Sequence, residues 1–246
     1  MIDDQRCFAS LNMTQIAVTF ALPAESSEFL RRLRDKSHAN RNGITTIRGK
    51  IGDGEVEVLH TGVGERVCRQ RLGKFLENQR FDLLISTGFA GALNDDMQVC
   101  DLLLAKNFST VDLNEKRSSV SRLPIHMADL STATTLSNSS DERTKIARTT
   151  GAAAVDMETE FIARVCAAHG IPLLSLRVIS DTPRNPFPAP AHVLFDVATQ
   201  RTDLPKLAAF FLTHPNRIPG LFQFARKIAH ARKTLADALV AIVREL

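Results

Sequence analysis

Carboxylates occupy two positions in the third quarter of the chain where they could act on a small molecule. The segment Ala154–Glu160 has the sequence AVDMETE and precedes an apolar pattern typical of a helix. The segment Arg177–Asp181, RVISD, ends a strand that we expect over 172–179. Open α/β sheets form their ligand crevice where strands end and helices begin. The sequence therefore predicts a small-molecule site that includes Glu158 and Asp181, although each acid alone also fits a turn or a helix start.

Two glycine pairs also follow expected strands. They are Gly62 and Gly64, after a strand expected over 55–59, and Gly88 and Gly91, after one expected over 81–86. Glycine lets the backbone approach a ligand closely, and its N–H groups can hold anions or sugar oxygens. Neither pair completes the dinucleotide fingerprint G-x-G-x-x-G, because Val67 takes the third glycine position of the first pair. Alone, each pair also fits a tight turn.

The elements that position these residues alternate between strands and helices. Further strands are expected over 15–20 and 101–105, and helices over 23–35, 66–78 and 218–246. The helix after the acidic segment carries Met157, Phe161, Val165 and Ala168 on one face. Residues 107–150 are polar and are expected to hold a strand and a variable loop, and 182–190 a loop. This order predicts an α/β protein whose mostly parallel sheet is covered by helices.

Composition narrows the class of protein. The chain of 246 residues has a net charge of only +4 and no Trp or Tyr, which disfavours nucleic acid as a partner. We expect a cytoplasmic protein, because no secretory signal opens the chain and no apolar run reaches the length of a membrane span. Four scattered cysteines form no C-x-x-C pair, so neither a metal site nor a disulfide framework is predicted.

The two ends of the chain differ from its middle. Residues 1–13 are expected to form a loose leader before a domain over 14–194, and 195–246 a basic, amphipathic helical extension of that domain. Such a helix either packs on its own core or a partner subunit, or meets lipid headgroups or a hydrophobic substrate. The sequence pattern leaves both open.

Residues 14–185 resemble the nucleoside phosphorylase superfamily, in particular its methylthioadenosine/S-adenosylhomocysteine nucleosidase branch. The resemblance is carried by STGFAGAL at 86–93, VDME at 155–158 and RVISD at 177–181, with ALPAE at 21–25 and TGVG at 61–64 in support. It implies a three-layer α/β/α fold with a mixed, mostly parallel central sheet. It also implies an enzyme that cleaves the N-glycosidic bond of a purine nucleoside without a cofactor, usually as a homo-oligomer. The tail resembles those of hopanoid-associated phosphorylases, which implies an adenosyl lipid as substrate.

The resemblance assigns roles to individual residues. Glu158 would bind the ribose hydroxyls and Met157 would lie beside the sugar, while Asp181 would protonate the purine at N7. Glu25 would orient the attacking water. The sugar or nucleophile pocket would be lined by Phe89, Ala90, Gly91 and Gly64, and the base pocket by Ser180 and Asp181.

These roles suit the chemistry of the bond. Cleavage passes through a ribosyl cation, which an anionic Glu158 would stabilise electrostatically. The departing base needs a proton, which Asp181 would supply provided that partial burial keeps it protonated.

The chain also departs from the family pattern. Phe89 stands where a small polar residue is usual, Asp156 replaces a Glu, and Cys100 replaces a Gly. The Gly-Asp-Pro phosphate motif of hexameric phosphorylases is missing near 21–28, which favours water over phosphate as the nucleophile and leaves phosphate open as a co-substrate.

Two alternatives remain. One is a non-catalytic nucleoside-binding protein on the same fold, because a fold does not guarantee activity. The other is a dinucleotide-dependent oxidoreductase, which would require the complete glycine fingerprint that this chain lacks.

Overall fold

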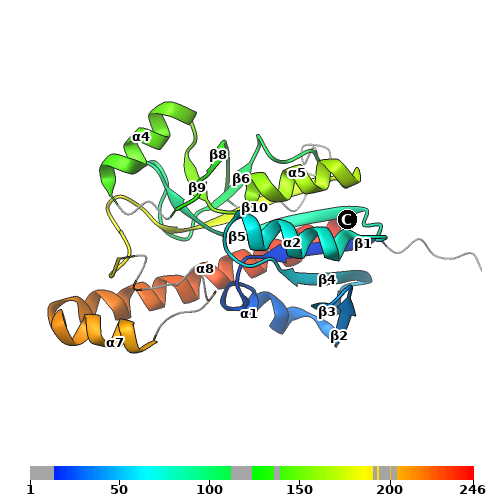
Figure 1. The fold of residues 1–246 in the computed structure, drawn as a ribbon, viewed down its shortest axis with the longest axis horizontal. Coiled ribbons are helices and arrows are strands. Elements are labelled where there is room, and N and C mark those ends of the chain that lie inside the picture. Colours follow the sequence, from blue (N-terminus) through cyan, green and yellow to red (C-terminus); the bar gives the residue numbers. More distant parts are fainter. Residues whose placement is uncertain (1–13, 112–123, 136–138, 191–192, 194–199, 201–203) are drawn as a thin grey trace, which may run out of the picture.

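A computed structural model describes residues 14–111, 124–135, 139–190, 193, 200 and 204–246. It has a mixed sheet with helices on both faces, the α/β/α arrangement expected from the sequence (Figure 1). The expected leader, residues 1–13, lies outside the described residues, and so does most of 191–203.

The described strands are β1 Gln15–Phe20, β2 Arg34–Arg41, β3 Ile44–Ile51, β4 Gly54–His60, β5 Leu83–Ala92, β6 Leu102–Ala105, β7 Ile125–Ala128, β8 Leu130–Thr132, β9 Ala154–Asp156 and β10 Leu173–Asp181. The helices are α1 Pro23–Arg32, α2 Glu65–Leu76, α4 Ser140–Thr150, α5 Thr159–His169, α7 Leu204–Thr213 and α8 Ile218–Glu245, with a 3₁₀ turn, η1, at Pro215–Arg217.

The sheet has the strand order β2-β3-β4-β1-β5-β10-β6-β7. Its centre is parallel, because β1 pairs in parallel with both β4 and β5, and β5 pairs in parallel with β10. Strands β2, β3 and β4 pair antiparallel, as do β6 and β10. The carboxyl ends of β1, β4, β5 and β10 therefore share one edge, where open α/β sheets bind ligands.

Alternation along β1 divides the core between the two faces of the sheet. Ile16, Val18 and Phe20 join one buried cluster with residues of α1 and α8, whereas Ala17 joins another with residues of α2 and α5. Successive side chains of a strand point to opposite faces, so a buried central strand is apolar throughout.

Three features differ from the sequence expectation. The helix expected over 23–35 ends at Arg32, and the next residues form β2 and β3, two strands that the sequence did not indicate. Gly88 and Gly91 lie inside β5 rather than in a turn after it. The acidic segment forms β9, and α5 begins only at Thr159.

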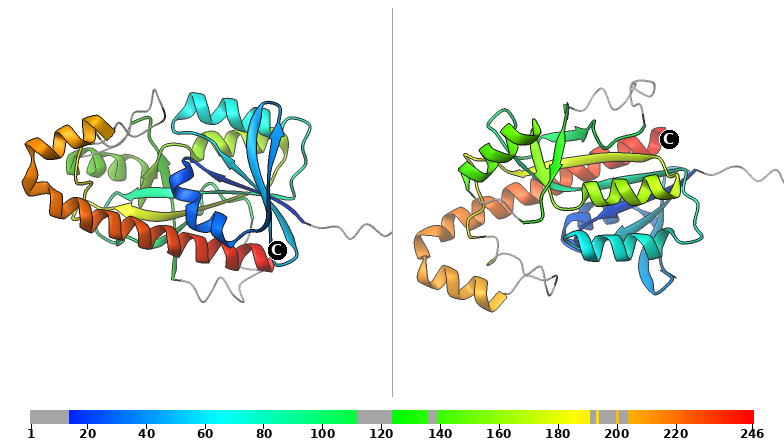
Figure 2. Two further views of the ribbon diagram at one scale, coloured as in Figure 1. Left: turned by 90° about the horizontal axis from the view of Figure 1, so that it is seen from below. Right: turned by 45° about the horizontal axis from the view of Figure 1, so that its top comes forward.

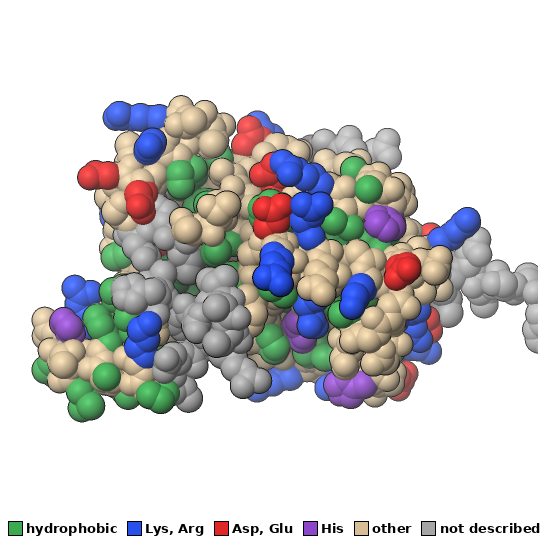
Figure 3. All heavy atoms as spheres, in the orientation of Figure 1, with side chains coloured by type: hydrophobic (Ala, Val, Ile, Leu, Met, Phe, Trp, Pro, Cys, Tyr) green, Lys and Arg blue, Asp and Glu red, His purple; other side chains and the backbone are tan. Residues whose placement is uncertain are grey.

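The C-terminal region forms a helical hairpin that projects from the sheet (Figure 2). Helix α8 is 28 residues long; its second half packs against α1 under the sheet, while its first half pairs with α7. Apolar side chains are exposed on the hairpin beside basic ones (Figure 3), with Leu212 at 82% and Phe222 at 66% exposure. Among the described residues, no helix combines the length and apolarity needed to span a bilayer.

Candidate active site

The carboxyl ends of β1, β4 and β5 surround a small cavity of about 10 Å³. Its lining includes Glu25, Glu158, Phe89, Gly88 and Arg177. Two of the sequence-predicted acids therefore meet at the predicted edge of the sheet. This volume is about enough for one water molecule.

Glu25 is held by the backbone around it. Its carboxylate accepts hydrogen bonds from the Leu22 N–H at 3.0 Å and the Phe89 N–H at 3.4 Å. Gly88 allows this approach, since a Cβ there would lie 3.3 Å from the carboxylate and its φ of +152° disfavours other residues. Burial raises the pKa of Glu25 above its ordinary value, although these N–H groups oppose the shift.

Glu158 occupies the N-cap position of α5 and is also buried. Its Oε1 accepts a hydrogen bond from the Gly64 N–H at 3.0 Å, which joins the first glycine pair to the acidic segment. Burial, reinforced by the negative charge of Asp156, raises the pKa of Glu158 to about 8. The carboxyl group is therefore largely protonated at neutral pH when no cation lies beside it.

A buried ion pair between Asp156 and Arg177 stands next to this cavity. The guanidinium donates to Asp156 Oδ2 at 3.0 Å and to Ser86 Oγ at 2.8 Å, and it also contacts Thr159 Oγ1. Removing one member of such a pair leaves an uncompensated buried charge. The pair fixes β9 and the start of α5 against β10, and thereby positions Glu158.

Asp181, at the end of β10, lines a second cavity of about 30 Å³ together with Met157 and Gly91. Its Oδ1 accepts a hydrogen bond from Ser180 Oγ at 2.6 Å. Its Oδ2 forms a buried ion pair with Arg143 of α4, whose Nη1 donates to the Ala92 carbonyl at 2.8 Å. Both oxygens of Asp181 thus accept hydrogen bonds from side-chain donors.

Glu158 and Asp181 therefore face separate small cavities in this structure. The cavities adjoin, because Met157 lines the second and its neighbour Glu158 the first, and because Arg177 of the first is bonded to Asp156 of the second. Neither volume exceeds the roughly 30 Å³ share of one liquid water, so a nucleoside would have to displace side chains. Arg143 fills the space beside Asp181 and is the first that would have to move.

The other sequence-predicted pocket residues lie close by but differ in exposure. Phe89 lines the first cavity, and its side chain also packs against the core cluster that includes α8. Ala90 is buried beside Ile179, with its carbonyl accepting from Ser180 Oγ at 3.3 Å. Its place in the sugar pocket stays a prediction.

The sequence did not single out Arg143 or assign a role to Arg177. Ser139, followed by Asp141 and Glu142, is a helix N-cap signature that could have located α4. No sequence feature marks Arg143 as the buried residue of that helix, which is otherwise polar and largely exposed. Arg177 lies in a strand whose nine residues are all buried, where a charged residue requires a partner.

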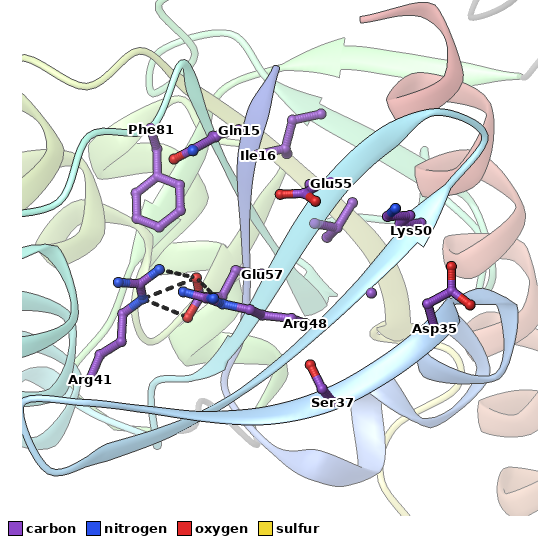
Figure 4. A pocket seen from close by; sticks show the side chains of 12 residues that line it. Gln15, Ile16, Asp35, Ser37, Arg41, Arg48, Lys50, Glu55, Glu57 and Phe81 are labelled. Atoms are coloured by element: carbon purple, nitrogen blue, oxygen red, sulfur yellow. Dashed lines mark hydrogen bonds and ion pairs between the residues drawn. The ribbon is translucent and has the colours of Figure 1, made fainter. Parts of the chain in front are cut away.

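Two further cavities outside this pair adjoin β1 and α1. One, of about 310 Å³, lies around the start of β1, where Arg41 and Arg48 point to the carboxylate of Glu57 (Figure 4). Burial opposes the ionisation of Glu57, but hydrogen bonds from Arg41 and Thr46 lower its pKa. These ion pairs therefore have a structural role. Across the described part of the chain, no cluster of three or more metal-ligating side chains occurs.

The other cavity, of about 370 Å³, has a mostly apolar lining and adjoins the start of α1. His60 lies in it with its Nε2 2.8 Å from Ser26 Oγ. Burial, assisted by Arg71, lowers the pKa of His60 to about 4, so the imidazole is neutral at physiological pH.

The family model of the phosphorylase superfamily matches residues 15–128 and 114–213, which include every element of this site. The chain belongs to the phosphorylase superfamily. Within this superfamily, it is 27% identical over 188 residues to the 5'-methylthioadenosine/S-adenosylhomocysteine nucleosidase of Haemophilus ducreyi. That match covers 64% of this chain and 81% of the relative. The corresponding nucleosidase of Staphylococcus haemolyticus is 23% identical over 195 residues, covering 68% and 86%.

Solved structures show the same superfamily fold. The 5'-methylthioadenosine/S-adenosylhomocysteine nucleosidase of Campylobacter jejuni aligns with a TM-score of 0.70 at 19% identity, over 95% of this chain and 100% of that one. A futalosine hydrolase mutant of Helicobacter pylori aligns with a TM-score of 0.70 at 17% identity, over the same shares. The expected membership and fold are thus confirmed, while the likeness of the tail to hopanoid-associated phosphorylases stays a prediction.

Proposed function

We propose that this phosphorylase-superfamily chain is an enzyme that cleaves the N-glycosidic bond of a purine nucleoside of the adenosyl type. The observation that carries the proposal is the gathering of three buried carboxyl groups, Glu25, Glu158 and Asp181, at the carboxyl edge of the parallel centre of the sheet. The nucleosidases to which the chain is similar act, by name, on adenosyl compounds, which supports this substrate class.

In this proposal Glu158 stabilises the sugar in the transition state. Burial disfavours its negative charge and raises its pKa. A cation about 4 Å away would contribute about 4 kcal/mol to the ionised form at an effective dielectric constant of 20. The carboxylate is thus stabilised most when the ribosyl cation develops, which is the differential binding that catalysis requires. Met157, next to it, would lie beside the same sugar.

Asp181 acts as the general acid toward the base, and Ser180 orients it. Oδ2 of Asp181 is engaged in the ion pair with Arg143. Proton donation therefore requires that the entering base displaces Arg143 from Oδ2. Asp181 takes up a proton from solvent when Arg143 leaves, and this proton then passes to N7 of the base. The bond between the base and the sugar breaks with its electron pair moving to the base.

Water is the nucleophile in this proposal. The cavity beside Glu25 has room for about one water, and Glu25 lies at its wall with an acceptor oxygen. Phosphate would need a free cationic group, yet Arg177, the cation that lines this cavity, is already bonded to Asp156 and Ser86. Attack by water at the sugar carbon would pass its proton to Glu25.

The test is a release assay with methylthioadenosine, adenosine, inosine and a lipid-linked adenosine, each with and without phosphate. Free base together with the free sugar, at a rate independent of phosphate, supports hydrolysis. Ribose 1-phosphate in place of the free sugar would overturn water as nucleophile. Nucleoside binding without base release over hours would favour the non-catalytic alternative.

We also propose that the chain forms a homo-oligomer in the cytoplasm and that the α7–α8 hairpin contacts lipid headgroups. Exposed Leu212 and Phe222 beside Arg217 and Arg226 support the second point, since apolar and basic side chains together suit an anionic lipid surface. Light scattering measures the mass of the oligomer. Sedimentation with anionic vesicles, lost in Leu212→Ser/Phe222→Ser, tests the contact, and unchanged sedimentation of this variant would refute it.

A further inference from the structure

A cavity of about 640 Å³ lies on the side of the β10 end away from the proposed base site. It is bounded by residues 95–100, by the turn after β10 and by α8. Thr182, which lines it, directly follows Asp181, which faces the second small cavity. The two cavities therefore share one short stretch of backbone without sharing their lining side chains.

Among the charged residues that line this cavity, cations outnumber carboxylates. Arg184, Arg226 and Lys227 face a single carboxylate, Asp95, and His230 adds an imidazole. Arg226 and His230 are four residues apart on α8 and lie on the same face of the helix. The cations thus come from two different elements and line one hollow, in which Arg184 and Arg226 are exposed to solvent.

The charges of this cavity are not balanced. Arg184 pairs with Asp95 at 3.0 Å, and Lys227 Nζ donates to the amide oxygen of Asn185 at 2.6 Å. Within the described residues, no carboxylate forms an ion pair with Arg226 or Lys227. The cluster of Arg41, Arg48 and Glu57 is different, because there both guanidinium groups form ion pairs with the carboxylate of Glu57. Like charges that converge without a counter-ion raise the local concentration of anions.

We propose that this cavity binds an anion of the phosphate class, either inorganic phosphate or the phosphate group of a larger molecule. Arg226 and Arg184 can each offer several N–H donors to phosphate oxygens, and Lys227 contributes a point charge. The backbone between Thr182 and Asn185 forms a tight turn with hydrogen bonds of 3.2 and 3.1 Å. A ligand bound by Arg184 and Lys227 would restrain the motion of this turn and, through it, of the end of β10 that carries Asp181. The site goes beyond the proposed nucleoside cleavage and does not depend on it.

Isothermal titration with inorganic phosphate, ribose 5-phosphate and adenosine 5'-monophosphate, at matched ionic strength in chloride, tests this site. The double variant Arg226→Gln/Lys227→Gln should bind each of them at least about tenfold more weakly than the wild type, because two charge-assisted contacts are lost. Lys233→Gln, a neutralisation at an exposed position of the same helix outside the cavity, should bind as the wild type does.

The outcomes separate the sources of the anion and the two proposed sites. Equal affinity for inorganic phosphate and the esters would indicate a free anion, while tighter binding of an ester would indicate a phosphorylated metabolite. No binding to the wild type at millimolar concentrations, or unchanged binding in the double variant, would overturn the site. Base release without phosphate should be unchanged in the double variant, so failure of the nucleosidase proposal leaves this test intact.

Discussion

Replacing Arg143 by Met tests the feature that most distinguishes this site, the buried ion pair on the proposed acid. Asp181 is 1% exposed and would keep only the Ser180 hydroxyl as a side-chain partner. Removing one partner of a buried pair typically costs about 3–5 kcal/mol, because the remaining charge stays buried without compensation. Arg143→Met should therefore lower the free energy of unfolding by about this amount, a large part of the total stability of a typical domain.

A double-mutant cycle isolates the pair itself. Asp181→Asn alone should also be destabilising, since it leaves the guanidinium of Arg143 uncompensated, whereas the double variant leaves no buried charge at this place. We expect the double variant to be more stable than the sum of the single effects by about 1–3 kcal/mol. Urea denaturation followed by circular dichroism measures all four proteins.

Arg148→Met is the matched control, because it removes an exposed arginine from the same helix and should change stability by less than about 0.5 kcal/mol. Additive effects of Arg143→Met and Asp181→Asn, to within about 0.5 kcal/mol, would refute the coupling. In that case Arg143 and Asp181 would not be energetically coupled, and the proposal that the base displaces Arg143 from Asp181 would be wrong.

Three further predictions concern the acids and one glycine. The pKa of Glu158 is raised from 4.5 to about 8, so between these pH values the folded protein keeps a proton on Glu158 that the unfolded chain has lost. The free energy of unfolding should therefore fall by up to about 1.4 kcal/mol per pH unit as the pH rises through this range. Glu158→Gln should flatten this slope in denaturation at pH 5.5, 6.5 and 7.5, and an unchanged slope would contradict the assignment. Asp181→Asn and Glu25→Gln should each lower the rate of base release by about 10²–10⁴-fold, and wild-type rates would exclude them as acid and base. Gly91→Ala places a Cβ 3.1 Å from Asp181 Oδ2 and 3.2 Å from Arg143 Nη1, so it should weaken the ion pair and lower the melting temperature, whereas an unchanged melting temperature would show that the pair can adjust.

The sequence predicted the layered fold because periodicity and strand order are local properties. The apolar runs of β5 and β10, with the glycines and acids at their ends, indicated a parallel sheet and its ligand edge. β2 was missed because it is almost entirely exposed and polar, so no alternation of apolar residues marks it as a strand. Gly88 and Gly91 suggested a turn, yet strand β5 continues through both. They are glycines for another reason, because the carboxylates of Glu25 and Asp181 approach the backbone there too closely for a side chain.

The sequence by itself determined which acids gather at the carboxyl edge of the sheet, because strand ends and helix starts carry Glu25, Glu158 and Asp181 to that edge in any such fold. Only the tertiary structure decided what surrounds them. Burial sets the pKa of Glu158, and a residue of the polar helix α4, distant in the chain, supplies the guanidinium that holds Asp181. Dielectric environment and long-range ion pairs depend on how elements pack in space, and no pattern along the chain encodes them.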